Sequence, residues 1–266
     1  MTSVALLGLP TDRHSSFLRG PAQAPAVIRA ALRSDASHQT ATTGLDVGGV
    51  LRDLGDLVLD VGDDDFERTV EAARAAFAEG PAIFLGGDHA VTYPILRGLF
   101  AARGQGPQIV HIDAHPDLYD DLDDDPLSHA SPFARILENG LAAGLTQLGI
   151  RTMNAQHQAQ VARFGVRVFA PEDHEAGLAA LPSGPTYLSI DMDGLDPAFA
   201  PGVSHHEPGG LTVREALAVI WRTPGPVIGG DIVELNPDRD IHGMTATVAA
   251  KLLKELAARI SADAGR

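Results

Sequence analysis

The sequence predicts an α/β protein built on a parallel β-sheet that helices cover on both faces. Short apolar runs alternate along the chain with longer segments in which apolar residues recur at helical spacing. The short runs are continuously apolar, which is typical of strands buried on both faces of a parallel sheet. With 266 residues and no internal repeat or linker, the chain is long enough for one large domain. We therefore expect a single domain over residues 1–266.

Each element is expected from its local pattern. In the first half, strands are expected at 3–8, 82–85 and 108–112, and helices at 21–33, at 66–79 and from about Val91. In the second half, strands are expected at 146–149, 166–169, 186–190 and 227–228, and helices at 132–141, around 155–163 and from about 245 to 260. The acidic run 63–65 favours a helix start at 66, because carboxylates stabilise a helix N-terminus.

Composition narrows the class of protein. The net charge of −15 argues against nucleic-acid binding and is compatible with a small cationic ligand. No apolar segment is long enough to span a membrane, and residues 1–10 read as a first strand rather than a signal peptide. The chain has no cysteine, which excludes thiolate nucleophiles and cysteine-based metal sites and fits a cytoplasmic protein.

Residues of the kinds that bind metals follow four of the predicted strands. These residues are His89, then Asp113, His115 and Asp117 at alternate positions, then Asp191 and Asp193, and finally Glu234. In a parallel α/β sheet the functional residues lie beyond the carboxyl ends of the strands, so we expect these side chains to converge.

The six histidines and aspartates in this set are enough ligands for two metal ions that share carboxylates. Four carboxylates balance the charge of two divalent cations, with the histidines neutral. Without metal, four neighbouring aspartates would repel one another and some would have to hold protons. Carboxylate oxygen and imidazole nitrogen together suit an ion such as manganese. The sequence therefore predicts a dinuclear metal site.

Three motifs make a family resemblance specific. They are Gly86-Gly87-Asp88-His89, Asp113-Ala114-His115-Pro116-Asp117 and Asp191-Met192-Asp193-Gly194-Leu195-Asp196-Pro197. They are similar to the signatures of the ureohydrolases, a family of arginases, agmatinases and other guanidino hydrolases. The resemblance covers nearly the whole chain. Residues 15–21, 128–136 and 200–205 look most like the plant arginases, which belong with the agmatinase-like branch.

The resemblance implies a three-layer αβα fold around a mainly parallel sheet of about eight strands. It implies a homo-oligomer, a trimer or hexamer, and two Mn²⁺ ions per chain bound by His89, Asp113, His115, Asp117, Asp191 and Asp193. His89 and Asp117 would each serve one ion and His115 the other, with Asp113 and the 191/193 pair bridging or completing the shells. A metal-bridging hydroxide would attack the guanidinium carbon and release urea.

Three residues acquire catalytic roles from this resemblance. Asp117 would orient the hydroxide, and Glu234 matches the family glutamate that receives the guanidinium, whose planar N–H fork suits a carboxylate. His129 matches the family histidine that shuttles protons to the leaving amine, although Ala130 replaces the glycine that commonly follows it. Ser128 and Ser131 are further candidates for substrate contacts.

Several other polar residues near the motifs are interpreted as supporting residues. Asp88 is expected in a turn or behind the ligands, and His111 in the core behind Asp113. His205 and His206 are expected in a loop or at the substrate rim. We interpret Glu207 and His242 as structural, and Gly229-Gly230 as permitting close backbone packing.

The substrate is predicted from the loop 118–128, which contains five aspartates and no lysine, arginine or asparagine. If this loop forms the pocket rim, it favours a cationic tail, so we expect agmatine, giving putrescine, over arginine, giving ornithine. If the loop faces solvent, Ser128 or Ser131 can still bind a carboxylate, and arginine or guanidinobutyrate stays open.

Two classes outside the ureohydrolases share some of these features. Zinc-dependent deacetylases of similar fold keep fewer ligands and one ion, so the presence of both His89 and His115 favours the two-metal enzyme. A non-catalytic metal-binding homologue would be expected to have lost a ligand or Glu234, and all are present.

Overall fold

Eight parallel strands form one sheet in the computed structural model, which describes residues 2–62 and 64–263. The strands are β1 Val4–Leu9, β2 Leu51–Asp56, β3 Ala82–Gly86, β4 Gln108–Ile112, β5 Gly144–Leu148, β6 Arg167–Phe169, β7 Thr186–Asp191 and β8 Val227–Val233. Their spatial order is β2-β1-β3-β8-β7-β4-β5-β6, and each neighbouring pair is parallel. The predicted α/β fold is confirmed, with an all-parallel sheet.

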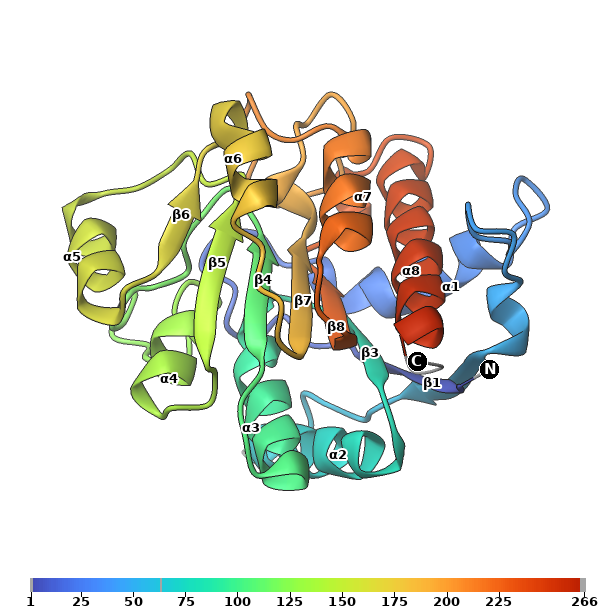
Figure 1. The fold of residues 1–266 in the computed structure, drawn as a ribbon, viewed down its shortest axis with the longest axis horizontal. Helices are drawn as coiled ribbons and strands as arrows, with labels where there is room; N and C mark the ends of the chain where they lie inside the picture. Colours follow the sequence, from blue (N-terminus) through green and yellow to red (C-terminus); the bar gives the residue numbers. More distant parts are fainter. Residues whose placement is uncertain (1, 63, 264–266) are drawn as a thin grey trace.

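Helices lie on both faces of this sheet (Figure 1). They are α1 Ala24–Leu32, α2 Asp65–Glu79, α3 Thr92–Arg103, α4 Pro132–Glu138, α5 Ala155–Phe164, α6 His174–Ala179, α7 Val213–Arg222 and α8 Met244–Asp263. In Figure 1, α7 and α8 lie on one side of the strands and α2 and α3 on the other. No helix among the described residues is long and apolar enough to cross a membrane.

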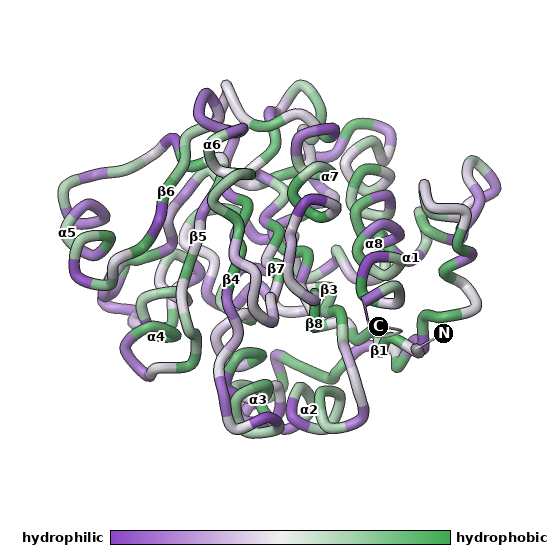
Figure 2. Tube along the Cα trace, in the orientation of Figure 1, coloured by the Kyte–Doolittle hydropathy of each residue, from purple (hydrophilic) through white to green (hydrophobic). Residues whose placement is uncertain are grey.

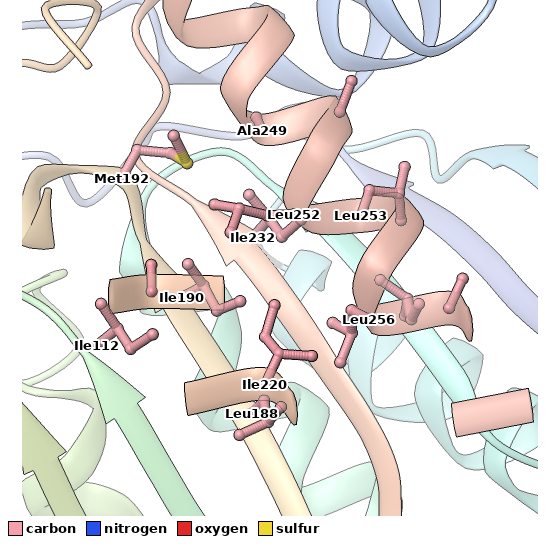
Figure 3. Packing of buried hydrophobic residues seen from close by; sticks show 14 of the residues in the cluster. Ile112, Leu188, Ile190, Met192, Ile220, Ile232, Ala249, Leu252, Leu253 and Leu256 are labelled. Atoms are coloured by element: carbon pink, nitrogen blue, oxygen red, sulfur yellow. The ribbon is translucent and has the colours of Figure 1, made fainter. Parts of the chain in front are cut away.

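Two apolar cores, one on each face, hold the three layers together. Alternate residues of β1 divide between them: Val4 and Leu6 belong to one cluster, and Ala5 and Leu7 to the other. This division follows from the strand period of two. Figure 3 shows the first core, where α7 and α8 pack on β7 and β8 through Ile220, Leu252, Leu253, Leu256, Leu188, Ile190 and Ile232. Polar and apolar residues alternate along α8 in Figure 2, as expected of a helix that covers a core.

Three elements are absent from the sequence prediction. Strand β2 is polar and largely exposed, because it is an edge strand that pairs with β1 alone. The sequence prediction also lacks the short helix α6. Helix α7 has a recognisable signal, since Thr212 and Glu215 form a capping box in which each side chain binds the other residue's backbone N–H. In the acidic run, Asp65 is the first residue of α2, one residue before the predicted start, and the N-cap Asp64 makes no side-chain capping bond. Asp63 lies outside the described residues.

The sheet order determines where the functional residues meet. Strands β3, β8, β7 and β4 are consecutive neighbours in the middle of the sheet. They are the four strands after which the sequence places metal-type residues. Because all four run in the same direction, their carboxyl ends lie at one edge.

Candidate metal centre and active site

The structure brings all six predicted metal ligands together at this edge. They form two overlapping groups, within each of which one ligand atom per residue lies within 4.8 Å of the others. The first group is His89, Asp113, Asp117 and Asp191, and the second is Asp113, His115 and Asp193. Asp113 belongs to both groups, as a carboxylate shared between two ions would.

Each group is built around the Nδ1 atom of an imidazole. His89 Nδ1 lies 3.2 Å from Asp113 Oδ2, 2.9 Å from Asp117 Oδ2 and 3.2 Å from Asp191 Oδ2. His115 Nδ1 lies 3.3 Å from Asp113 Oδ1 and 3.2 Å from Asp193 Oδ2. The first group is buried, and His115 is partly exposed toward solvent.

The far side of the His89 ring shows that this arrangement fits a cation. Ser189 Oγ donates to Asp231 Oδ1 at 2.6 Å and lies 2.9 Å from His89 Nε2. Because the serine proton is used on Asp231, Ser189 accepts from His89 Nε2–H. His89 Nδ1 then faces carboxylate oxygens, so either a proton or a metal cation must lie between them.

The pKa values lead to the same conclusion. Burial lowers the pKa of His89, but Asp113, Asp117 and Asp191 raise it well above its ordinary value. Burial, together with the charges of Asp193 and Asp113, raises the pKa of Asp191 well above its ordinary value. Without metal, the cluster must therefore take up protons. Two divalent ions would remove that need, so the buried His/Asp cluster is consistent with a binuclear metal site.

His111 supports Asp113 from behind. Its Nε2 lies 2.7 Å from Asp113 Oδ2, while Gln147 Nε2 donates to His111 Nδ1 at 3.0 Å and to the Pro116 carbonyl at 2.7 Å. Because Nδ1 accepts a hydrogen bond, the ring proton is on Nε2 and is donated to Asp113. Both ring nitrogens are therefore used, and His111 has the expected supporting position.

Backbone geometry around the site is unusual in two places. Asp117 and Glu234 have φ values of +50° and +62°, in the left-handed region that non-glycine residues rarely adopt. A Cβ on Gly87 would lie 1.7 Å from the Thr11 carbonyl oxygen, so only glycine allows the N-terminal loop this close to the His89 turn.

His129 and Glu234 lie against each other beside the metal cluster. His129 Nδ1 is 2.7 Å from Glu234 Oε1, which also accepts from the His89 backbone N–H at 3.0 Å. Burial lowers the pKa of His129, but the Glu234 carboxylate raises it to about 9. Burial raises the pKa of Glu234, but His129 more than compensates and lowers it below its ordinary value. The two therefore form a close acid–base pair, and His129 Nε2 lies 2.8 Å from Ser16 Oγ and 3.3 Å from the Ser16 backbone nitrogen.

A cavity of about 450 Å³ opens above these residues. Of the predicted site residues, its walls contain His115, Asp117, His129, Asp191, Asp193 and Glu234. The walls also contain Ser16, Tyr119, Leu122, Ala130, Arg151, Thr152, Met153, Asn154, His157, His205 and Glu207. His205 has the rim position proposed for it, and Glu207, interpreted as structural, also lines the cavity. Ser16 and Ala130 belong to the segments 15–21 and 128–136 that resemble the plant arginases, whereas Tyr119, Leu122 and the residues of 151–157 belong to none of the motifs.

Arg151 shows how one of these loops is held. Its guanidinium donates to the carbonyl oxygens of Asp193 at 2.7 Å, Glu207 at 2.6 Å and Gly149 at 2.9 Å. These bonds tie the wall loops to the segment that bears Asp193. The Arg151 guanidinium is thus hydrogen-bonded to backbone carbonyl oxygens.

Some predicted contacts are not in the cavity wall. Ser128 is buried and its Oγ accepts from the Ala130 N–H at 3.3 Å, and Ser131 is buried at the start of α4. Neither residue lines the cavity, because both side chains turn into the packed start of this helix. Asp88 is a turn residue whose Oδ2 accepts from the His14 N–H at 2.9 Å. His206 binds the Pro201 carbonyl outside the cavity.

The acidic loop also differs from the expected rim. Asp120 faces Gln160 and Arg163, and Asp125 Oδ2 lies 2.7 Å from His14 Nδ1. None of the five loop aspartates lines the cavity, whose wall takes only Tyr119 and Leu122 from this loop. The condition on which the agmatine prediction rested is therefore not met.

Comparisons with known proteins agree with this geometry. The model of the arginase family matches residues 2–258. Arginase 1 from Arabidopsis thaliana is 44% identical over 97% of this chain and 81% of its own length. Guanidinopropionase from Pseudomonas aeruginosa is 35% identical, covering 99% of this chain and 88% of its own, and chicken agmatinase is 33% identical, covering 95% and 79%.

A solved structure extends the agreement to the fold. The arginase from Medicago truncatula superposes with a TM-score of 0.92 at 39% identity, covering 97% of this chain and 87% of that one. The metal cluster, the cavity above it and this family match lead to one conclusion. The chain belongs to the arginase family and is a ureohydrolase, a hydrolase that acts on linear amidines.

Proposed function

We propose that the protein hydrolyses L-arginine to L-ornithine and urea with two Mn²⁺ ions. The observation that carries this proposal is the 44% identity to a plant arginase over nearly the whole chain, against 33% for an agmatinase. The position of the loop aspartates outside the cavity supports it, because they were the reason to favour agmatine. Another guanidino compound, such as guanidinobutyrate, is the alternative.

The proposed ion ligands are the two overlapping groups around His89 and His115, with Asp113 shared. Two divalent ions bound there would lower the pKa of the attacking water toward neutrality. Asp117 would accept a hydrogen bond from that water and orient it. Its left-handed backbone places the carboxylate at both the cluster and the cavity.

Glu234 and His129 would act on the substrate from the other side. The Glu234 carboxylate is buried and ionised, and it suits the planar N–H fork of a guanidinium. With its pKa raised to about 9, His129 carries a proton at neutral pH that it can give to the leaving amine. The pair is already in contact, so the substrate would bind beside a preformed acid.

Urea release from arginine, agmatine and guanidinobutyrate, each with added manganese, tests the substrate. We expect arginine to have the highest kcat/KM. Faster turnover of agmatine would overturn the arginine proposal, and no urea from any of the three would overturn it in favour of another guanidino compound. The homotrimer or homohexamer that the family resemblance implies remains a prediction.

A further inference from the structure

Both ring nitrogens of His129 have partners in the structure. Nδ1 lies 2.7 Å from Glu234 Oε1, and Nε2 lies 2.8 Å from Ser16 Oγ. The Ser16 backbone N–H also donates to Nε2, at 3.3 Å. His129 is buried, whereas Ser16 is exposed and lines the cavity. Ser16 thus connects the buried ring to the space in which a substrate would bind.

The N-terminal loop 11–20 holds Ser16 at this position through its backbone. The His14 carbonyl oxygen accepts from the His129 N–H at 3.2 Å, so this loop binds both the backbone and the ring of His129. The His14 N–H donates to Asp88 Oδ2 at 2.9 Å, which ties the loop to the turn after β3. None of these bonds uses the Ser16 hydroxyl, so the hydroxyl can be removed while the loop stays in place.

A hydroxyl group suits the His129 ring in both of its protonation states. When Nε2 has no proton, the hydroxyl and the backbone N–H of Ser16 can both donate to its lone pair. When Nε2 is protonated, the backbone N–H cannot accept, and the hydroxyl oxygen is the Ser16 atom that can. Because hydrogen bonds to a charged group are the stronger ones, the Ser16 hydroxyl favours the protonated ring.

Other ionisable groups also act on the His129 ring. They are Glu234 after β8, Asp117 after β4, Asp88 after β3, His205 in the loop before α7, and His14 in the N-terminal loop. Burial lowers the pKa of His129, and the three carboxylates raise it. The His205 ring lies with its centroid 5.5 Å from that of His129. A substitution at Ser16 leaves all these groups present, so a change in the titration of His129 reports the lost hydroxyl.

Resting on the proposed role of His129 as the proton donor, we propose that Ser16 is a positioning residue of the reaction. Its hydroxyl accepts from the protonated Nε2, while Nδ1 stays bonded to Glu234. The ring is thereby held at both nitrogens, and its protonated form is stabilised beside the substrate. Ser16 acts through His129 and neither gains nor loses a proton itself.

The variant Ser16→Ala removes the acceptor and keeps the backbone N–H that favours the unprotonated ring. We expect the fall of kcat at high pH to begin about one pH unit lower than in the wild type, which is the size of one lost hydrogen bond to a charged group. At pH 9, kcat should therefore be about fivefold below that of the wild type, with KM little changed.

A matched pair of variants separates the hydroxyl from the shape of the side chain. Ser16→Thr keeps a hydroxyl, and Ser16→Val has the shape of threonine without one. Because the position is exposed, either side chain can be accommodated. S16T should keep the wild-type pH profile of kcat, and S16V should behave like S16A. Thermal unfolding of each variant shows that the comparison is made between folded proteins.

Ser15→Ala is the control in the neighbouring position of the same loop. The Ser15 hydroxyl donates to Asp88 Oδ2 at 3.4 Å rather than to His129, so S15A should leave the pH profile of kcat unchanged. A double variant tests whether Ser16 acts through His129. Adding S16A to His129→Asn should have no further effect on kcat, because the ring that Ser16 positions is already absent.

Urea release by the manganese-loaded protein is measured with whichever guanidino compound it hydrolyses fastest, so the test does not depend on the identity of the substrate. A wild-type pH profile in S16A and S16V contradicts the role of Ser16, even if kcat falls at every pH. An equal shift in S16T and S16V contradicts it as well, and so does a further loss in the double variant. If the wild type hydrolyses no guanidino compound, the proposed function itself is wrong.

Discussion

At the scale of single residues, the site consists of pairs in which one side chain fixes the protonation of another. Gln147 fixes the proton of His111, which donates to Asp113, and Asp231 fixes Ser189, which accepts from His89. In both series of hydrogen bonds, a side chain outside the cluster decides which atom of its neighbour faces the cluster. The ligand atoms are thereby prepared for cations before any ion arrives.

The direction in which the stability and the activity should depend on pH follows from the His129–Glu234 pair. The folded-state pKa of His129 is raised from 6.5 to about 9. The stabilisation of the fold by the protonated His129 is therefore fully present below pH 6.5 and is lost as the pH rises through about 9. We expect kcat to fall above about pH 9, when the proton donor is lost. A pH series of kcat for the wild type and His129→Asn checks this. A wild-type profile that is flat to pH 10, or an unchanged limb in the variant, contradicts the assigned role.

At the scale of elements, the capping box of α7 shows a helix start that sequence alone encodes. Thr212 Oγ1 accepts from the Glu215 N–H at 3.2 Å, and Glu215 Oε2 accepts from the Thr212 N–H at 2.8 Å. The helix covers the core through Ala216, Val219 and Ile220. Its position on the sheet therefore depends on a correct start.

Thr212→Ala should lower the free energy of unfolding by about 1 kcal/mol, because an orphan N–H at the helix start loses its acceptor. Urea unfolding followed by circular dichroism measures the change. Thr212→Ser retains a capping hydroxyl and should recover most of it. Equal loss in both variants would show that the methyl contact, rather than the cap, stabilises the start of α7.

The elements also show which parts of the site the sequence could predict. The metal ligands directly follow apolar strands. The family resemblance of Asp113–Asp117 and of the two other motifs rests on short stretches of sequence. The convergence of these ligands could therefore be predicted. Much of the rest of the cavity wall comes from Tyr119, from 151–154 with His157 in the first turn of α5, and from 205–207. Most of these residues lie in irregular loops. Where such loops turn depends on tertiary contacts, such as those of Arg151, that no local pattern records.

The acidic loop illustrates the same limit. The aspartates of this loop are obvious in its composition, but composition does not show which way their side chains point. Asp120 is drawn to Gln160 and Arg163 of α5, and Asp125 to His14 of the N-terminal loop. These partners, distant in sequence, hold the carboxylates away from the cavity, which removes the reason to predict agmatine as the substrate.

At the scale of the whole molecule, the metal centre joins segments that span most of the chain. Removing the ions should therefore destabilise the entire fold, since it leaves four buried aspartates facing one another. At free manganese a hundredfold above its Kd, the protein should gain about 2.7 kcal/mol of stability for each ion bound. Thermal unfolding with EDTA and across a manganese titration checks this. A midpoint independent of manganese would contradict a cluster that binds ions.

The sheet order has a consequence for how the chain is made. Strands β3 and β4 follow each other in sequence but are separated in space by β8 and β7, which come much later along the chain. During synthesis, the facing edges of β3 and β4 therefore stay without their neighbours until the last third of the protein has emerged. Long-range pairing of this kind is slow and leaves unpaired strand edges open to wrong partners. Asp191 and Asp193 arrive with the strands that close this gap, so the newly made chain completes its sheet and its ion-binding cluster in the same late step.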